Sequence, residues 1–172
     1  MKLPTEQQCL QYFTEYKVPE NILKHCLKVQ QVAIVLGKHV AKTGLTLNQE
    51  LISRTALLHD LFKMIAITNF GTGPHQNAVL TPEQKIFWQE MKIKFPNHYE
   101  GDVAYEMFKE EYPELATTLK NVSNPHITTP TWEEQIVHYA DTRVFQNEVV
   151  SIGERFAYLQ ERAAKHKVQF DF

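Results

Sequence analysis

A histidine and an aspartate stand side by side in an apolar run of the sequence. His59 and Asp60 follow the segment 55–58, and Lys63 comes three residues after the aspartate. The surrounding residues are apolar on almost every side of a helix, which is typical of a buried helix. Burying an ionised carboxylate costs several kcal/mol or more unless it is paired or binds a metal. Because imidazole and carboxylate are both good ligands for borderline divalent ions, the pair indicates a candidate metal site.

Three more histidines and one more aspartate lie at positions where the sequence predicts an inward-facing side chain, a helix start or a turn. His25 shares an apolar stripe of its helix, although a lone histidine there is more often a core residue than a ligand. Asp141 ends the apolar stretch 136–140, where a leucine would be expected. His98 lies just inside an expected helix start, and His126 lies in a turn. Each is a weak signal alone, but together they form the ordered pattern H…HD…H…H…D.

The sequence predicts a series of helices, separated by short loops and marked by capping residues, and these helices must position the side chains. Capping boxes are expected where Thr5, Thr81, Thr131 and Ser151 are each followed three residues later by Gln or Glu. Asn97 with Glu100 forms a similar expected start, and Gly44 is expected to close the second helix. No strand-like alternation persists, so the sequence predicts an all-α fold. The expected helices run over 5–16, 20–42, 48–66, 81–95, 97–111, 113–122, 131 through 141, and 151–165.

The length and composition predict one ordinary globular domain. A chain of 172 residues, 43% of them hydrophobic, is long enough for one core and too short for two comfortable ones. We expect a single helical domain over 1–172, with its core at about 20–162 and an N-terminal helix packed on it. The net charge of -2 gives no global basic field, so no nucleic-acid polymer is expected as a partner. A monomer or a homodimer is compatible with the sequence.

The cysteines and the apolar runs favour a soluble cytoplasmic protein. Cys9 and Cys26 form neither a CxxC pair nor a disulfide framework, which fits a reducing compartment. The segment Met1–Gln8 is polar and lacks the apolar core of a signal peptide. The longest purely apolar run, Val32–Leu36, is far shorter than a membrane span. We therefore expect no membrane association.

The ordered histidines and aspartates, with their neighbours, resemble the HD superfamily of metal-dependent phosphohydrolases. The resemblance spans about 20–162 and implies a helical bundle of the HD-domain type. One departure is Leu61-Phe62, where the family often has Ile-Gly, so Phe62 is expected to change the pocket shape and leave the ligand types intact. The matching segments are His25 with Val29 and Ala33, Ala56-Leu57-Leu58-His59-Asp60 with Lys63, His98-Tyr99-Glu100-Gly101 with Ala104, His126, and Ala140-Asp141-Thr142-Arg143-Val144.

The resemblance implies a role for each matching residue. It implies that His25, His59, Asp60 and Asp141 hold one metal, that Asp60 can bridge to a second ion, and that His98 and His126 hold that second ion. One or two divalent transition metal ions are expected, and manganese, iron, zinc, cobalt and nickel all suit this ligand set. Asp60 and Lys63 are the candidate catalytic residues. Lys63 fits two interpretations about equally, a charge that contacts a substrate phosphate or a solvated lysine at a helix end.

The function that the sequence favours is hydrolysis of a small phosphorylated substrate, an ester or an anhydride, with a nucleotide or dinucleotide foremost. One alternative is a di-iron oxygenase, because that superfamily also contains oxygenases with a similar six-ligand set. Another is a non-catalytic binding module that retains the metal, although the full ligand set argues against it. His138 shares a helix face with Asp141 and is interpreted as packing. The loop Thr68–Leu80 is expected to contribute pocket walls that select the substrate.

Overall fold

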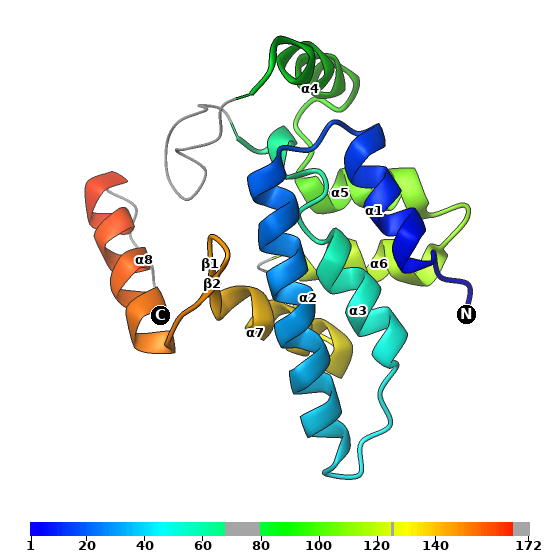
Figure 1. Ribbon diagram of the computed structural model, residues 1–172, viewed down its shortest axis with the longest axis vertical. Coiled ribbons are helices and arrows are strands. Elements are labelled where there is room, and N and C mark those ends of the chain that lie inside the picture. Colours follow the sequence, from blue (N-terminus) through cyan, green and yellow to red (C-terminus); the bar gives the residue numbers. More distant parts are fainter. Residues whose placement is uncertain (68–79, 125, 167–172) are drawn as a thin grey trace.

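The described part of the chain is mostly helical, as the sequence predicts (Figure 1). The computed structural model describes residues 1–67, 80–124 and 126–166, so the expected loop Thr68–Leu80 lies outside them except for Leu80. Within these residues, no helix is both long and apolar enough to cross a lipid bilayer. The elements are α1 (Glu6–Glu15), α2 (Glu20–Ala41), α3 (Gln49–Leu58), the 3₁₀ helix η1 (Lys63–Ile65), α4 (Pro82–Lys94), α5 (Glu100–Phe108), α6 (Pro113–Val122), α7 (Trp132–Thr142), β1 (Val144–Phe145), β2 (Glu148–Val149) and α8 (Ile152–His166).

Several helices begin where their capping residues predict. Thr5, Thr81 and Thr131 each accept a hydrogen bond from the backbone N–H three residues later, and the side chain of that later residue bonds back. α2 is followed by Gly44 with φ +95°, a backbone conformation that glycine adopts without strain. The expected start at Asn97 is wrong. Asn97 has φ +61°, and α5 begins at Glu100 instead.

The helix that carries the His-Asp pair ends earlier than expected. α3 ends at Leu58 rather than near residue 66. His59 Nδ1 lies 2.8 Å from the carbonyl oxygen of Ala56, the acceptor that a continuing α-helix would offer to the N–H of Asp60. Tighter bonds between residues three apart follow, from Leu61 N–H to Leu58 O and from Lys63 N–H to Asp60 O. The pair therefore lies at a helix end, where its side chains are free to turn toward α2 and α7.

Two clusters of buried hydrophobic residues form the core. The larger cluster draws on α1, the first half of α2, α3 with the segment 61–65 that follows it, and α4 to α6, and includes Cys9 and Phe13 of α1. The smaller cluster joins the second half of α2 to α3 and α7. Both cysteines are buried and unpaired, as expected. α1 thus packs onto the rest of the chain through its buried face.

The candidate site lies where the two clusters meet. On α2, His25 lies between Ile22, which belongs to the larger cluster, and Val29, which belongs to the smaller one. On α7, Asp141 follows Ala140 of the smaller cluster. Hydrophobic packing on both sides therefore fixes the helices that carry the site, while the polar side chains occupy the seam between the clusters.

A two-stranded hairpin follows α7 and departs from the all-α prediction. Its strands of two residues each are too short to give an alternating sequence pattern. Arg143 braces the hairpin, because its Nε donates to the carbonyl oxygen of Val150 at 2.7 Å. The ring of Phe145 contacts Tyr158 of α8 with centroids 4.5 Å apart. The hairpin thus links α8, which lies at the edge of the molecule in Figure 1, to the end of α7.

Candidate metal centre

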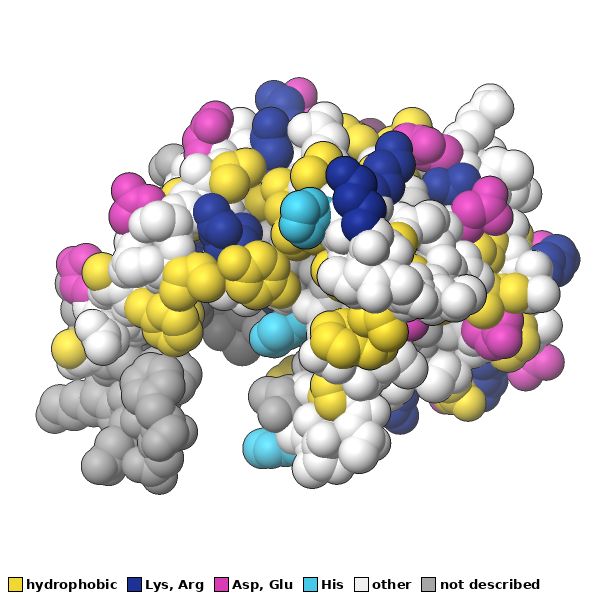
Figure 2. Space-filling view, turned by 90° about the horizontal axis from the view of Figure 1, so that it is seen from below, with side chains coloured by type: hydrophobic (Ala, Val, Ile, Leu, Met, Phe, Trp, Pro, Cys, Tyr) yellow, Lys and Arg dark blue, Asp and Glu magenta, His cyan; other side chains and the backbone are white. Residues whose placement is uncertain are grey.

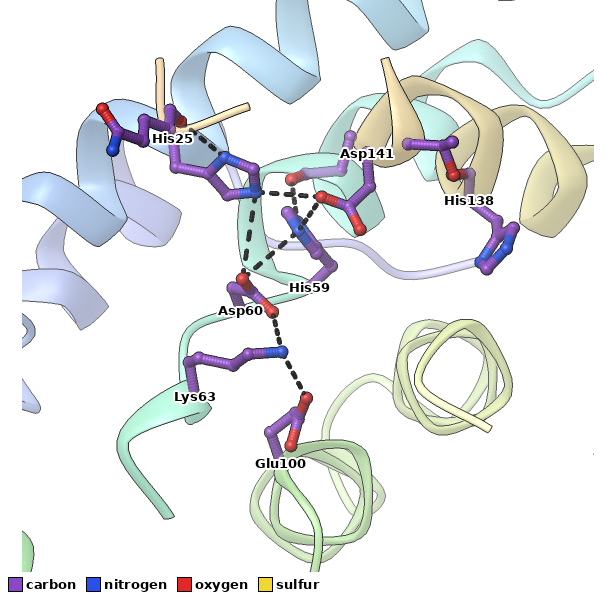
Figure 3. A network of polar contacts seen from close by, with 10 residues as sticks. His25, His59, Asp60, Lys63, Glu100, His138 and Asp141 are labelled. Atoms are coloured by element: carbon purple, nitrogen blue, oxygen red, sulfur yellow. Dashed lines mark hydrogen bonds and ion pairs between the residues drawn. The ribbon is translucent and has the colours of Figure 1, made fainter. Parts of the chain in front are cut away.

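Four predicted site residues meet at the seam between α2, α3 and α7. One ligand-type atom from each of His25, His59 and Asp60 lies within 4.8 Å of the other two. Asp141 joins them, since its Oδ1 lies 2.9 Å from His25 Nε2 and 3.5 Å from His59 Nε2. Asp60 Oδ2 lies 3.9 Å and 3.7 Å from the same two nitrogens. Figure 3 shows the four side chains pointing toward one another.

Backbone carbonyl groups fix the orientation of both imidazole rings. His25 Nδ1 lies 2.6 Å from the carbonyl oxygen of Gln146, and His59 Nδ1 lies 2.8 Å from that of Ala56. A carbonyl oxygen can only accept, so both Nδ1 atoms carry the proton and donate. In the neutral rings the two Nε2 atoms are then lone-pair acceptors aimed at carboxylate oxygens. Such an arrangement needs a cation between the groups, either protons on the rings or a metal ion.

The residues present fit a divalent transition metal. Nitrogen and oxygen atoms bound to one tetrahedral zinc ion lie about 3.3–3.5 Å apart, given metal–ligand distances of roughly 2.0–2.2 Å. The four contacts between the histidine nitrogens and the carboxylate oxygens, at 2.9 to 3.9 Å, bracket that separation. His59 Nε2 is also buried without a hydrogen-bond partner among the described residues. A metal ligand role would satisfy this orphaned atom, and the donating Nδ1–H groups are the usual support of a metal-bound histidine.

The electrostatics of the cluster also favour a bound cation. Burial lowers the pKa of His59, but the charge of Asp60 together with the contacts to Cys26 and Asp141 outweighs burial, so the pKa is raised well above 6.5. Burial raises the pKa of Asp141, yet the contacts with His25 and His59 hold it well below 3.8. The pKa of Asp60 is also lowered, against the effect of burial, by Lys63 and His59. The two carboxylates are therefore ionised and attract positive charge into the seam.

Lys63 continues the network away from the four clustered residues. Its Nζ lies 3.3 Å from Asp60 Oδ1 and 2.8 Å from Glu100 Oε1, and its side chain is 31% exposed (Figure 3). Both carboxylates raise its pKa despite burial. The alternative that Lys63 is simply a solvated lysine at a helix end is therefore wrong, because two carboxylates pair with its ammonium group. Contact with a substrate phosphate stays a prediction.

Sequence reasoning gave Glu100, the partner of Lys63, a place in the expected helix start with Asn97 but no role in the site. The sequence signal was limited to its place in the His98-Tyr99-Glu100-Gly101 segment. Gly101 explains part of that segment, because a Cβ there would lie 2.7 Å from the Cβ of Ser123, which directly follows α6, and 3.1 Å from the Cα of Lys120 on α6. α5 and the end of α6 thus approach closely at Gly101, and the neighbouring Glu100 accepts a hydrogen bond from Lys63 of η1.

The structure does not bring His98 and His126 into the cluster. His98 is exposed, with Nδ1 2.9 Å from the carbonyl oxygen of Pro96, and no described contact joins it to the other ligands. His126 is also exposed and lines a pocket together with Glu100 and His138. The role of His98 and His126 at a second ion stays a prediction. His138 is exposed as well, so its interpretation as a packing residue is wrong.

Phe62, the departure from the family pattern, lies in the core. Its ring centroid lies 4.9 Å from that of Tyr16, 6.3 Å from that of Phe108 and 6.5 Å from that of Trp88. Phe62 is not among the described residues that line the pocket near Glu100. Its aromatic ring strengthens the packing beneath the His-Asp pair rather than narrowing that pocket.

The turn of the hairpin supplies a testable support for His25. Gln146 has φ +58°, as the first central residue of a two-residue hairpin turn requires, and its carbonyl oxygen accepts from His25 Nδ1. We expect Gln146→Pro to lower metal affinity about tenfold to a hundredfold, because proline holds φ near −65° and displaces this carbonyl. Gln146→Gly is the matched control and should bind metal like the unaltered chain, since glycine adopts the same φ. Equal affinity of both variants in a metal titration would contradict the role of this carbonyl.

The support for the candidate metal centre comes from its geometry and from the sequence motifs. Comparisons with protein-family models, with curated proteins and with solved structures find no match to this chain. A function must therefore be argued from the chemistry that these side chains can perform.

Proposed function

We propose that this chain is a metal-dependent phosphohydrolase, which holds a divalent transition metal at His25, His59, Asp60 and Asp141 and cleaves a small phosphate ester or anhydride such as a nucleotide or dinucleotide. The observation that carries the proposal is the convergence of two histidine Nε2 atoms and two carboxylates in a largely buried seam. The resemblance of the ordered motifs to the HD superfamily supports the reaction class.

The residues around the cluster suit phosphate chemistry. A bound divalent ion supplies a water molecule whose pKa falls from about 15.7 to about 7, which makes hydroxide available at neutral pH. Lys63 places a fixed positive charge beside Asp60, where it favours an anionic phosphate group. Glu100 holds that ammonium group in place through Oε1. Asp60 thus belongs to both the candidate metal site and the cationic contact.

The surface charge favours a small substrate over a nucleic-acid polymer. Figure 2 shows basic and acidic side chains interspersed over the face seen from below, among the residues that are described. A protein that binds a polymer backbone needs several unpaired lysine or arginine side chains in a continuous track. The mixed charges on this face and the net charge of -2 argue for a compact phosphorylated ligand.

The first test is the metal content of the purified chain. Elemental analysis should find at least one transition metal ion per chain, lost when His59→Ala and Asp60→Ala are combined. A second ion would support roles for His98 and His126 as ligands. No ion, even after reconstitution with manganese, iron or zinc, would overturn the proposal and make the cluster structural.

The second test is phosphate release from a panel of nucleotides by the metal-loaded chain. Release that requires the metal and disappears in the double variant supports a hydrolase. Oxygen consumption by an iron-loaded chain that releases no phosphate would point instead to oxygenase chemistry. Metal binding without either reaction would indicate a binding module.

A further inference from the structure

The ammonium group of Lys63 lies beside the Asp60 oxygen that a second metal ion would need. The resemblance to the HD superfamily implies that Asp60 bridges two ions, and the ions of such two-metal sites lie about 3.5–4 Å apart. Asp60 Oδ2 faces the Nε2 atoms of His25 and His59, where the first ion would bind. Asp60 Oδ1, the oxygen left for a second ion, lies 3.3 Å from Lys63 Nζ. The oxygen that would bridge is therefore already paired with a cation.

Glu100 holds the ammonium group in this position. Its Oε1 lies 2.8 Å from Lys63 Nζ, and Figure 3 shows the ammonium group between the two carboxylates, on the side of Asp60 away from the histidines. The side chains of Asp60 and Glu100 are 10% and 12% exposed, so water screens the charges here poorly. A divalent ion at Asp60 Oδ1 would lie next to a positive charge that two carboxylates keep in place. Repulsion between the two cations therefore opposes a second ion.

The two histidines expected to hold a second ion, His98 and His126, have no described contact with Asp60. Both are exposed, and Nδ1 of His98 faces the carbonyl oxygen of Pro96 in its own segment. The described residues contain one group of potential ligands whose atoms lie within 4.8 Å of one another, and its members are His25, His59 and Asp60. The described residues therefore fit one metal ion and do not fit a second.

We propose that the centre binds a single divalent metal ion, with the ammonium group of Lys63 in the position at Asp60 Oδ1 that a second ion would occupy. The inference rests on the proposed function in one respect, that a metal ion binds at the four clustered residues. An ammonium group has three donors, and in the described part of the chain Asp60 and Glu100 account for two of them. The third donor remains for a phosphate oxygen of the substrate. One metal ion and one lysine thus share the task of holding phosphate that two ions perform in a dinuclear site.

The number of bound ions and their spacing test this inference. The full chain is loaded with excess Mn²⁺, freed of unbound metal by gel filtration, and measured by elemental analysis and electron paramagnetic resonance. We expect one ion per chain and the spectrum of an isolated Mn²⁺ ion, because no neighbouring ion couples to it. Two ions per chain, or exchange coupling between neighbouring ions, would overturn the inference.

Removing the ammonium group provides a second test. Lys63→Met keeps an unbranched side chain and removes the charge, which leaves the carboxylates of Asp60 and Glu100 without a cation between them. We expect this variant to bind two Mn²⁺ ions that show exchange coupling. Lys63→Arg keeps the positive charge, so this matched control should still bind one ion. The side chain of Lys63 is 31% exposed, so both variants should fold, which circular dichroism checks. A folded Lys63→Met chain that still binds one ion would show that the ammonium group does not take the place of a second ion.

The two exposed histidines offer a third test. His98→Ala combined with His126→Ala should leave one Mn²⁺ ion per chain with unchanged affinity, because neither side chain is a ligand in this arrangement. Removing even a residue that supports a metal ligand lowers metal affinity about tenfold to a hundredfold. A loss of that size in the double variant would therefore overturn the inference.

The outcomes separate this inference from the proposed function. A chain that binds one isolated ion and releases no phosphate supports the inference and contradicts the hydrolase. A chain that releases phosphate with two coupled ions supports the hydrolase and overturns the inference. A chain that binds no ion overturns both, because the cluster would then not be a metal centre.

Discussion

Replacing Asp60 by Asn should lower metal affinity by more than about a hundredfold and reduce phosphate release below detection. Asp60 Oδ2 faces the Nε2 atoms of both histidines, and Oδ1 faces Lys63. The amide keeps the size of the side chain and removes its charge. Removing a residue that only hydrogen-bonds to a metal ligand lowers metal affinity about tenfold to a hundredfold. Removing a ligand itself should therefore lower the affinity more. Metal affinity by competition titration and phosphate release from nucleotides measure the two effects.

A control must show that the loss arises at the centre. Glu106→Gln neutralises an acidic side chain on α5 that pairs only with Lys109 in the described contacts, so its metal affinity and activity should match the unaltered chain. Circular dichroism and thermal unfolding should show that both variants are folded. Appreciable phosphate release by folded Asp60→Asn, or by Asp60→Ala, would remove Asp60 from the reaction.

The parts of the fold that could be predicted depend on local chemistry. Thr5, Thr81 and Thr131 start their helices through bonds that span three residues, so the sequence alone contains both partners. The end of α3 could not be predicted in this way, because the apolar pattern continues past Leu58 while the ring of His59 occupies the carbonyl of Ala56. The hairpin was missed because two-residue strands are too short for any period to show.

The candidate site also has residues that the sequence predicted and supporting contacts that it did not. His25 and Asp141 were candidates because each is a polar residue in an apolar segment, and the resemblance to the HD superfamily implied that they join the His-Asp pair at one metal. The supports of the site were not predicted. The carbonyl of Gln146 reaches His25, and the carboxylate of Glu100 reaches Lys63, only through the packing of distant segments, and neither has a sequence pattern that specifies its partner.

The metal-free centre should hold a proton at neutral pH. The pKa of His59 is raised well above 6.5 because the charge of Asp60 and the contacts to Cys26 and Asp141 together outweigh burial. Its unfolded pKa is about 6.5, so the folded chain holds more protons than the unfolded chain above that pH. The stability contributed by protonated His59 is therefore fully present below about pH 6.5 and is lost as the pH rises through the raised folded pKa. To bind a metal, His59 must instead be neutral, with no proton on Nε2.

Metal affinity should therefore rise about tenfold per pH unit through the neutral range, because each binding event displaces at least the proton of His59. In thermal unfolding from about pH 6 to about pH 9, the melting temperature of the metal-free chain should fall relative to that of the metal-loaded chain. His39→Ala removes an exposed histidine on α2 and should leave this divergence unchanged, whereas His59→Ala should abolish it. A constant difference in melting temperature across this range would show that His59 holds no proton that the metal displaces. The candidate centre would then lose the residue on which its electrostatic argument depends.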